Sequence, residues 1–442
     1  MKYKRYPKYK DSGIEWIGEI PEGWEVKKIK RDTPIMRGAS PRPIDDQRFF
    51  DDEGEYAWVR ISDVTRSNGK LQKTTQRLSD EGSSLSVKLH PGELFLSIAG
   101  SVGKPCVADI KCCIHDGFVY FPKLTINKKI LYYIFEAGKC YGGLGKLGTQ
   151  LNLNTDTVGN IKIPVPPKNE SDEISEFLDK QTAQFDELIA KSKAQITLLE
   201  EKRQATITQA VTKGLDPSVP MKDSGVEWIG DIPQHWEVRK VKLSSYVKGR
   251  IGYHGLRSDE FIDEGPYLIT GTDFKDGGIN WNTCYHVPEW RYEQDPFIQI
   301  KNNDVLITKD GTVGKIAFIE NIPGKTTLNS HLLVVRPLKN SYQPRFLYWI
   351  LLADCFTYYV NLVQSGTIMN ALSQEKLENF VFPLPPILEE NQITEFLDKQ
   401  ITQFDELIAK SKAQITLLEE KRQALITATV TGKIDVRSEV VA

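Results

Sequence analysis

The sequence lacks long hydrophobic runs. None of its apolar stretches approaches the roughly 18–20 residues that a membrane span needs, and the basic, aromatic residues 1–10 are not followed by the apolar segment of a secretory signal. We therefore expect a cytoplasmic protein with no membrane partner. The basic residues at the start are expected to form a flexible arm.

The six cysteines lack any spacing that marks a bound metal or a redox site. No CxxC pair is present, and Cys112 and Cys113 are adjacent, which suits neither a simple disulfide nor a zinc knuckle. We therefore expect buried or incidental thiols and no metal site.

The chain also lacks an excess of charge of either sign. The formal net charge of −2 gives the whole chain no attraction to nucleic acid, which counts against tight DNA binding by the chain alone. Because 40% of the residues are hydrophobic and 26% are charged, the chain is expected to be globular. Its length suggests about three structural units.

What the sequence does contain is an internal duplication. The segment 10–18 (KDSGIEWIG) returns at 222–230 as KDSGVEWIG, and the segment 184–205 recurs letter for letter at 403–424. The offset changes from 212 to 219 residues between these blocks, which indicates insertions in surface loops. The chain is therefore two copies of one module.

Each copy is predicted to end in a long helix. The segment 172–213 contains no Pro or Gly, and its apolar residues fall at near-heptad spacing with polar interruptions, so it resembles one strand of a coiled coil. Pro167 marks its start and Gly214 its end; the second helix covers about 392–431 and stops at Gly432. Neither helix can bury its apolar stripe alone, so we expect the two to pair antiparallel.

The segments between the helices predict mixed domains. Short apolar runs bounded by Gly, Asn and Asp, such as 93–98 and 304–308, indicate strands with tight turns. One helix is expected near 130–137 and its counterpart near 344–362. The predicted fold class is α+β: two domains of mixed α/β content, separated by two long helices in an antiparallel coiled coil, with a pseudo-two-fold internal repeat. The expected parts are an N-terminal segment (1–30), a first variable domain (31–168), a central helix (169–214), a repeat of the N-terminal segment (215–242), a second variable domain (243–387), a C-terminal helix (388–432) and a tail (433–442).

Each variable domain carries a Gly-x-Val-Gly-Lys loop that fails as a nucleotide site. The phosphate-loop pattern needs a glycine where the first copy has Ile98 and a Ser or Thr where it has Pro105; the second copy fails likewise with Lys309 and Ile316. Two interpretations stay open. The loop is a glycine turn between strands, or its backbone amides and lysine approach a DNA phosphate or base edge.

No other catalytic motif is present in the sequence. It has no glycine-rich fingerprint for S-adenosylmethionine and no Asn/Asp-Pro-Pro-aromatic motif of an amino-methylating site. The six histidines do not recur at equivalent positions of the two copies, and the dyad His115-Asp116 is predicted to have a packing or surface role. We expect no catalytic residues and no cofactor on this chain.

A binding function would rest on residues in or beside the loops. Residues 31–163 hold 18 Lys and Arg against 15 Asp and Glu, a local +3, and residues 243–382 hold 13 against 15, a local −2, so neither domain has a strong electrostatic footprint. Each candidate alone is more often a solvated surface residue. The candidates for DNA contact are Arg37, Arg42, Arg60, Ser101 and Lys104 in the first domain, and Arg250, Lys309, Thr312 and Lys315 in the second.

The helices match almost fully while the domains differ. One explanation is recent exchange between the repeats; the other is that both helices bind the same partner while the domains read different targets. The second predicts an asymmetric, two-part target and two copies of a partner. The helix residues expected to contact that partner are Phe177, Phe185, Leu188, Phe396, Phe404 and Leu407.

The combination of these motifs resembles one known family. The chain has an Ile-Pro-Glu-Gly-Trp-Glu opening at 20–25, a Gly-x-Val-Gly-Lys loop in each domain, Pro-x-Pro-Pro exits at 164–167 and 383–386, and helix starts with Glu-Phe-Leu-Asp-Lys-Gln at Glu176 and Glu395. Over essentially its whole length it is similar to the specificity subunit of type I restriction-modification enzymes.

The resemblance implies a division of labour. Each variable domain would be a target recognition domain that reads one half-site of double-stranded DNA, and the coiled coil would set the spacer. Two modification subunits would bind the helical regions and bring S-adenosylmethionine for adenine N6 methylation; restriction subunits, where present, would add translocation and cleavage with ATP and Mg²⁺. Three alternatives stay open: a subunit that serves methylation alone, a scaffold whose domains bind proteins across a coiled-coil spacer, and an enzyme with an unrecognised site.

Overall fold

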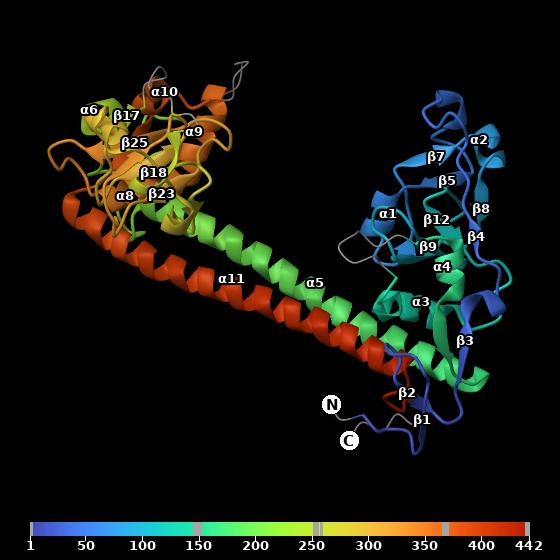
Figure 1. The fold of residues 1–442 in the computed structure, drawn as a ribbon. Helices are drawn as coiled ribbons and strands as arrows, with labels where there is room; N and C mark the ends of the chain where they lie inside the picture. The colour runs from blue at the N-terminus through green and yellow to red at the C-terminus, as the bar shows by residue number, and fades with distance from the viewer. Residues whose placement is uncertain (1–2, 145–152, 251–255, 257–259, 365–370, 438–442) are drawn as a thin grey trace. The chain divides into compact units, whose positions relative to one another are not determined.

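The computed structural model describes residues 3–144, 153–250, 256, 260–364 and 371–437. The chain divides into two units by its internal contacts: unit 1 holds residues 1–192 and 413–442, and unit 2 holds residues 193–412. The two long helices pass from one unit into the other, so each unit contains part of both (Figure 1).

The long helices are α5 (Lys168–Lys213) and α11 (Ile387–Val430). Both predicted helices are confirmed, and each begins one residue before the expected 169 and 388, directly behind the second proline and with acidic side chains in its first turn. The predicted ends hold: Gly214 follows α5 with φ 77° and Gly432 follows α11 with φ 68°, a conformation that glycine adopts without strain.

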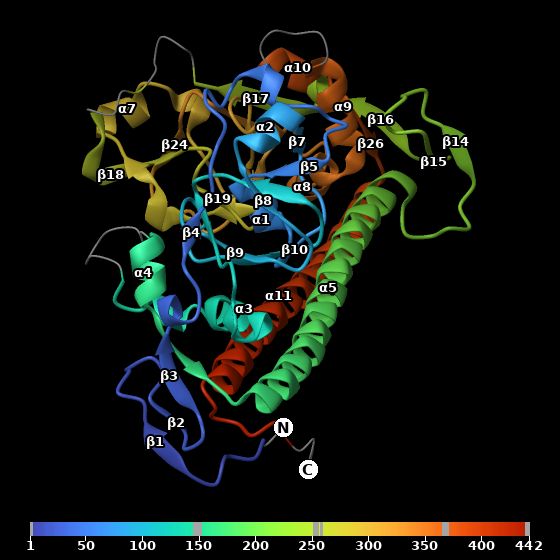
Figure 2. The same ribbon diagram turned by 90° about the vertical axis from the view of Figure 1, so that its right-hand side faces the viewer.

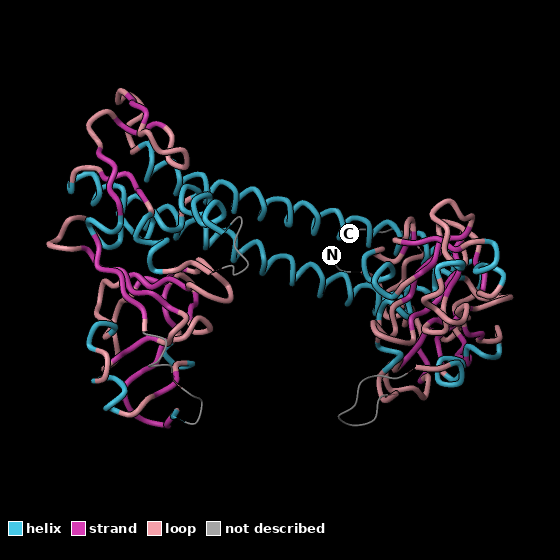
Figure 3. The backbone as a smooth tube through the Cα atoms, turned by 90° about the horizontal axis from the view of Figure 1, so that it is seen from above, coloured by secondary structure: helices cyan, strands magenta, loops and turns pink. Residues whose placement is uncertain are grey.

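The two helices lie side by side (Figure 3) and run antiparallel, as predicted, because the colour by residue number advances in opposite directions along them (Figure 1). In unit 1 the first part of α5 lies beside the last part of α11, and in unit 2 the last part of α5 lies beside the first part of α11. The same repeated residues line both contacts: Ile189 and Ile426 are buried in unit 1, and Ile207 and Ile408 are buried in unit 2. Burial of these apolar side chains drives the pairing.

The globular part of unit 1 has two sheets. Their strand orders are β4-β12-β9-β10-β6 and β7-β5-β11-β8, with the further pairs β1-β2 and β3-β13. The strands are β1 (Tyr9–Asp11), β2 (Glu19–Pro21), β3 (Glu25–Lys28), β4 (Met36–Arg37), β5 (Tyr56–Val59), β6 (Lys70–Leu71), β7 (Gln76–Leu78), β8 (Val87–Leu89), β9 (Leu94–Ser97), β10 (Pro105–Ala108), β11 (Cys112–Ile114), β12 (Phe118–Tyr120) and β13 (Lys162–Val165). The short helices are α1 (Ile61–Arg66), α2 (Asp80–Ser84), α3 (Lys128–Ala137) and α4 (Thr155–Asn160).

The predicted strand at 93–98 is β9, and it is buried on both faces. Leu94 and Leu96 pack in one cluster with α3 and with the buried side of both long helices, whereas Phe95 packs between the two sheets. Helix α3, the helix predicted near 130–137, therefore lies between the five-stranded sheet and the long helices (Figures 1 and 2).

Unit 2 repeats this plan. Its sheets have the orders β17-β25-β22-β23 and β21-β18-β24, with the pairs β14-β15, β16-β26 and β19-β20. The strands are β14 (Met221–Asp223), β15 (Asp231–Pro233), β16 (Glu237–Lys240), β17 (Ser245–Gly249), β18 (Ile262–Ile269), β19 (Phe274–Lys275), β20 (Gly278–Ile279), β21 (Tyr285–His286), β22 (Val305–Thr308), β23 (Ile316–Phe318), β24 (Thr326–Leu328), β25 (Leu332–Pro337) and β26 (Val381–Leu384). The short helices are α6 (Val241–Ser244), α7 (Glu289–Glu293), α8 (Pro344–Leu352), α9 (Asp354–Gln364) and α10 (Gln374–Asn379). The predicted strand at 304–308 is β22, and α8 takes the place of α3.

The single helix predicted near 344–362 is wrong, because the structure has two helices that meet at 63°. Ala353 between them is extended, with φ −81° and ψ 161°. Side chains of α5 bind the backbone groups freed at the break: Gln204 Nε2 donates to the carbonyl of Leu352 at 2.9 Å, and Thr208 Oγ1 accepts from the amide of Asp354 at 3.0 Å. Among the described residues no single helix is long and apolar enough to cross a bilayer; this bent pair meets the length and composition test only when taken together.

The flexible arm expected at the start of the chain is also wrong for the residues that the structure describes. Tyr6 is buried, and its hydroxyl donates to the carboxylate of Glu170 on α5. Tyr9 lies in β1 and its hydroxyl donates to the carbonyl of Gly432 at 3.1 Å. Tyrosines between the lysines thus bind this segment to the helices, while Met1 and Lys2 lie outside the described residues. The six cysteines are free and buried, as expected.

Candidate nucleic-acid interface

The two Gly-x-Val-Gly-Lys loops have the same backbone geometry. The loop of the first domain connects β9 to β10, and that of the second connects β22 to β23. The Gly103 amide donates to the Ser97 carbonyl at 2.8 Å, and the Gly314 amide donates to the Thr308 carbonyl at 2.9 Å. Gly103 and Gly314 both have φ near +84°, at 83° and 84°, which explains why this position is glycine in both copies. Both loops are turns between antiparallel strands.

Residues from two further segments of the first domain lie beside its loop. The Thr65 hydroxyl of α1 lies 3.0 Å from the Ser101 hydroxyl, and Lys104 Nζ lies 3.4 Å from the Thr65 carbonyl. The Gly117 carbonyl accepts from the Ile98 amide at 2.8 Å, which places the turn between β11 and β12 beside the loop. Together these turns form one edge of the domain.

Asp116, in the turn between β11 and β12, brings two of the predicted arginines together. Arg37 Nε donates to the Asp116 carbonyl at 2.5 Å, and Arg42 Nη2 lies 3.2 Å from the Asp116 carboxylate. Both arginines are exposed, so their guanidinium groups stay accessible. Arg60, exposed at the start of α1, lies near enough to affect the neighbouring His115, whose pKa is lowered by burial first and by Arg60 to a smaller extent. All five candidates of the first domain therefore lie along this edge.

The second domain presents the equivalent edge with fewer cations. Thr312 and Lys315 are exposed on the loop. Lys309 Nζ lies 3.7 Å from Asp310, and the same carboxylate lies 3.3 Å from Nδ1 of His331. Carboxylate pairing offsets part of the positive charge of Lys309, consistent with the lower local charge of this domain.

Arg250 differs from the other candidates, because its side chain is only 3% exposed. It donates from Nε to the Leu328 carbonyl at 2.9 Å and from Nη2 to the Thr327 hydroxyl at 3.0 Å. Here the guanidinium binds strand β24 from the inside, and burial lowers its pKa. In this structure the residue supports the sheet behind the edge.

Sequence reasoning missed a second group of cations on the first domain. Arg66, Lys70 and Lys73 line a hollow of about 400 Å³ next to α1, together with Gln72 and Thr74. All three cations are exposed. The signal in the sequence was a high density of basic and hydroxyl residues over 66–75, a segment without the repeated Gly-x-Val-Gly-Lys pattern of the loop.

The candidate partner residues on the helices divide into two kinds. Leu188 and Leu407, which occupy the same repeat position, are each 47% exposed, and Phe396 is 37% exposed. Phe177 and Phe404 are partly buried against the cores of their own units. Phe185 is half-buried. A further equivalent pair that the sequence prediction missed, Leu198 and Leu417, is 51% and 49% exposed.

No group of three or more His, Cys, Asp and Glu side chains within the described ranges is placed to hold a metal ion. Burial also raises the pKa of the thiols, for example that of Cys113 to about 11, so they stay protonated and unreactive near neutral pH.

Comparison with known proteins identifies the chain. The family described as "Type I restriction modification DNA specificity domain" matches it twice, over residues 21–198 and 236–417. The chain belongs to this family. It is therefore a type I specificity subunit, the non-catalytic component that recognises DNA, and the protein-binding scaffold is not favoured.

Relatives of this specificity subunit match over nearly their whole length. The putative specificity subunit of type I restriction enzyme MjaX from Methanocaldococcus jannaschii is 24% identical over 436 residues, which cover 96% of each chain. The MjaVIII specificity subunit of the same organism is 26% identical over 431 residues, 95% of each chain. A chain in a solved structure on complex assembly and conformational transition of the type I R-M system shares the fold, with a TM-score of 0.71 at 16% identity over 94% of this chain and 99% of that one. The predicted fold class is thereby confirmed.

Proposed function

We propose that the two variable domains each read one half of an asymmetric, bipartite site in double-stranded DNA. The observation that carries the proposal is the equivalence of the two loop edges: the same strands present them, with the same glycine turns, but with different side chains. Two domains with the same backbone edge but different side chains on it are suited to recognising two different DNA sequences.

The residues of each edge suggest how the reading is divided. The exposed guanidinium groups of Arg37 and Arg42 can donate two parallel hydrogen bonds to a guanine edge, and Lys104 and Lys315 are placed to approach phosphates. The hydroxyls of Ser101 and Thr312 can bind either a base edge or a phosphate. We assign Arg60 and Lys309 to the same edges, and Arg250 to support of the second edge from within.

Partner subunits would supply the chemistry and much of the affinity. Specificity subunits of type I systems work with DNA and with methyltransferase and restriction subunits. We propose that two modification subunits bind the two equivalent helix surfaces that carry Leu188 and Leu407, and that they bring S-adenosylmethionine for adenine N6 methylation. Restriction subunits would add ATP- and Mg²⁺-dependent cleavage where the system includes them. The low local charge of both domains supports shared binding of the DNA, and the cytoplasm is the proposed place of action.

The helices would set the distance between the half-sites. At about 1.5 Å per residue, α5 measures about 69 Å. This length is enough to hold two readers one duplex turn, roughly 34–36 Å, or more apart.

A domain exchange tests the proposal. Residues 31–168 are replaced by the corresponding domain of another specificity subunit, and methylated adenines are mapped in cells that also express the modification subunit. One half of the methylated motif should change while the other half and the spacer remain. A change in both halves or in neither would contradict the two-reader proposal, and a protein-binding scaffold would give no methylated motif.

A further inference from the structure

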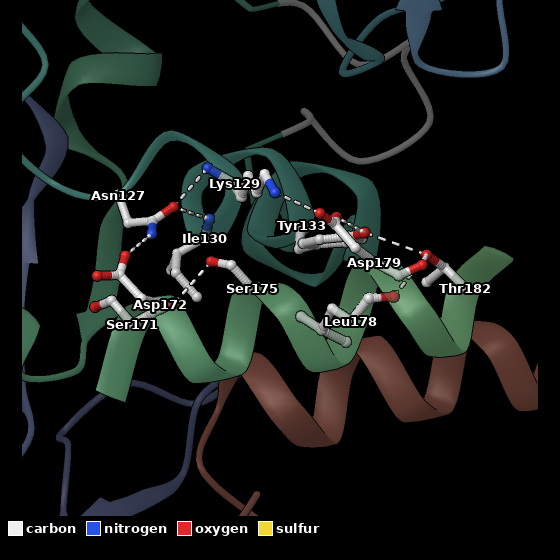
Figure 4. A network of polar contacts seen from close by, with 10 residues as sticks. All are labelled: Asn127, Lys129, Ile130, Tyr133, Ser171, Asp172, Ser175, Leu178, Asp179 and Thr182. Carbon is white, nitrogen blue, oxygen red and sulfur yellow. Dashed lines mark hydrogen bonds and ion pairs between the residues drawn. The ribbon is translucent and has the colours of Figure 1, made fainter. Parts of the chain in front are cut away.

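In unit 1 a directional polar contact fixes the recognition domain to the long helices. Lys129 and Tyr133, one turn apart on α3, both bind Asp179 on α5 (Figure 4). Lys129 Nζ lies 2.5 Å from Oδ2, and the Tyr133 hydroxyl donates to Oδ1 at 2.7 Å. Burial, with a further contribution from the Asp179 carboxylate, raises the pKa of Tyr133, so its hydroxyl stays a donor.

Unit 2 makes the same contact with different residues. Arg345 and Trp349, again one turn apart but on α8, both bind Oδ1 of Asp398, through Arg345 Nε at 3.0 Å and Trp349 Nε1 at 3.1 Å. Asp398 follows Asp179 by 219 residues and is its equivalent in the repeat. The helix residue has been kept in both copies, while the two donors differ between them.

The opposite long helix provides a second fixed point in each unit. Gln423 on α11 donates from Nε2 to the Glu136 carbonyl at the end of α3, at 2.9 Å. Gln204 on α5 donates to the Leu352 carbonyl at the end of α8, also at 2.9 Å. Gln204 and Gln423 are likewise equivalent positions. Each domain helix is thus bound at its start by an aspartate of one long helix and at its end by a glutamine of the other.

Two separated directional contacts restrict rotation in a way that apolar packing does not. The packing of α3 on the long helices is largely hydrophobic, although Glu136 of α3 also accepts from Arg422, and hydrophobic contact is non-directional. Hydrogen bonds lose most of their strength when the donor and acceptor are misaligned, so the two contacts favour one angle of the domain on the coiled coil. That angle determines where the loop edge lies relative to the helices.

We propose that Asp179 and Asp398 are positioning residues that fix the angle of each reading edge, and through it the spacer length at which both half-sites can be bound together. This inference rests on the proposed function of the two edges. The contact between each domain and the coiled coil would then help to select the spacer length, together with the length of the helices.

The test changes the domain side of the joint and leaves the helices unaltered. Lys129→Met with Tyr133→Phe removes both donors to Asp179, and Arg345→Met with Trp349→Phe removes both donors to Asp398. Glu55→Gln is the matched control: its ion pair with Lys111 is as exposed as that of Lys129 with Asp179, and it does not involve the long helices. Lys129→Arg keeps a donor and should retain wild-type behaviour.

Each variant is purified with the modification subunit and assayed on DNA that carries both half-sites with the native spacer or with one base pair more or fewer. The ratio of methylation rates, native to altered spacer, should fall about tenfold in each double variant, which corresponds to about 1.4 kcal/mol. The ratio should be unchanged in Glu55→Gln. Thermal unfolding of each complex separates a changed angle from a loss of folded protein.

Three outcomes are distinguishable. A lower ratio in a folded complex supports the positioning role. An unchanged ratio, or an equal loss of methylation at every spacer length, overturns it, because a residue that serves stability alone would not alter spacer selection. If the wild-type complex shows no bipartite motif at all, the proposed function itself is wrong.

Discussion

Arg422 of α11 donates from Nε to Oδ1 of Asp186 on α5 at 2.9 Å. The equivalent pair in unit 2, Arg203 and Asp405, has the same 2.9 Å separation. The two differ in their surroundings, since Arg422 also donates to Glu136 at 3.1 Å, whereas Leu352 occupies that position in unit 2. The Arg422 side chain is accordingly the less exposed of the two arginines, 14% against 30%.

Replacement of Arg422 by Met should destabilise unit 1 more than Arg203→Met destabilises unit 2. The first change leaves two partly buried carboxylates without their cation, at an expected cost of about 2–3 kcal/mol, below the value for a fully buried pair because Asp186 and Glu136 retain some solvent. Hydrogen exchange at the amides of α3 reports the stability of unit 1, and exchange at those of α8 reports the stability of unit 2. Equal effects in both units would show that Glu136 contributes nothing.

The stability of unit 2 should depend on pH through Glu390. This residue is 1% exposed, and burial raises its pKa from about 4.5 to about 7. The folded chain therefore holds the proton more tightly than the unfolded chain, so stability is greatest below about pH 4.5 and falls as pH rises towards 7. Glu390→Gln keeps an acceptor for the Gln343 amide, which donates at 2.6 Å, and removes the titration.

Urea unfolding at pH 5 to 8 tests this dependence. Above pH 7 the glutamine variant should be more stable than the wild type by about 3 kcal/mol, and the two should converge towards pH 5. Unit 1 has Ser171 at the equivalent position and should not show this transition. Parallel stability curves for variant and wild type would mean that Glu390 is ionised in the folded chain.

Lys315→Ala should weaken the binding of DNA by the second domain. If Lys315 contacts a phosphate, the affinity of the complex should fall similarly for all sequences, and the slope of log K against log salt should drop by about one. If it contacts a base, discrimination at one position should fall by about 1–3 kcal/mol. Binding assays across a salt series, with each half-site varied in turn, distinguish the two.

A matched control for this lysine lies at the other end of β22. Lys301 is exposed and precedes β22, at the end away from the loop, so Lys301→Ala should change neither quantity. Arg42→Ala is the corresponding variant of the first domain and should affect the other half-site. If Lys315→Ala leaves the affinity, the salt slope and the base discrimination all unchanged, the lysine lies outside the reading edge.

The repeat and the long helices could be predicted because their signals are local in sequence. A run free of Pro and Gly, bounded by Pro167 and Gly214, determines the helix almost by itself. The break at Ala353 could not be predicted, because it depends on Gln204 and Thr208, which lie about 150 residues earlier in the chain. The packed N-terminal segment was missed for the same reason, since Tyr6 packs against Trp24 and donates to Glu170, which lies 164 residues later in the chain.

The candidate interface shows the same limit. The glycine loops were visible as motifs, and the structure groups five candidates of the first domain along one edge. Burial of Arg250 follows from the carbonyl of Leu328, which no local pattern reveals. The contacts between each domain and the long helices could not be predicted, because the donors differ in residue type between the two copies. Lys129 and Tyr133 bind Asp179 in unit 1, and Arg345 and Trp349 bind Asp398 in unit 2.

The contact between the start and the end of the chain has a topological consequence. Lys433 donates to the Glu19 carbonyl at 2.5 Å, as Lys213 donates to the carbonyl of Asp231 at the equivalent position of unit 2. Only the second pair is joined by a short continuous segment. The two contacts are equivalent, but in the first the chain between the long helix and the strand is not continuous. The order of the two domains along the chain therefore does not determine the fold. A circular permutant that begins within 215–220 and links the present first and last residues should form the same contacts.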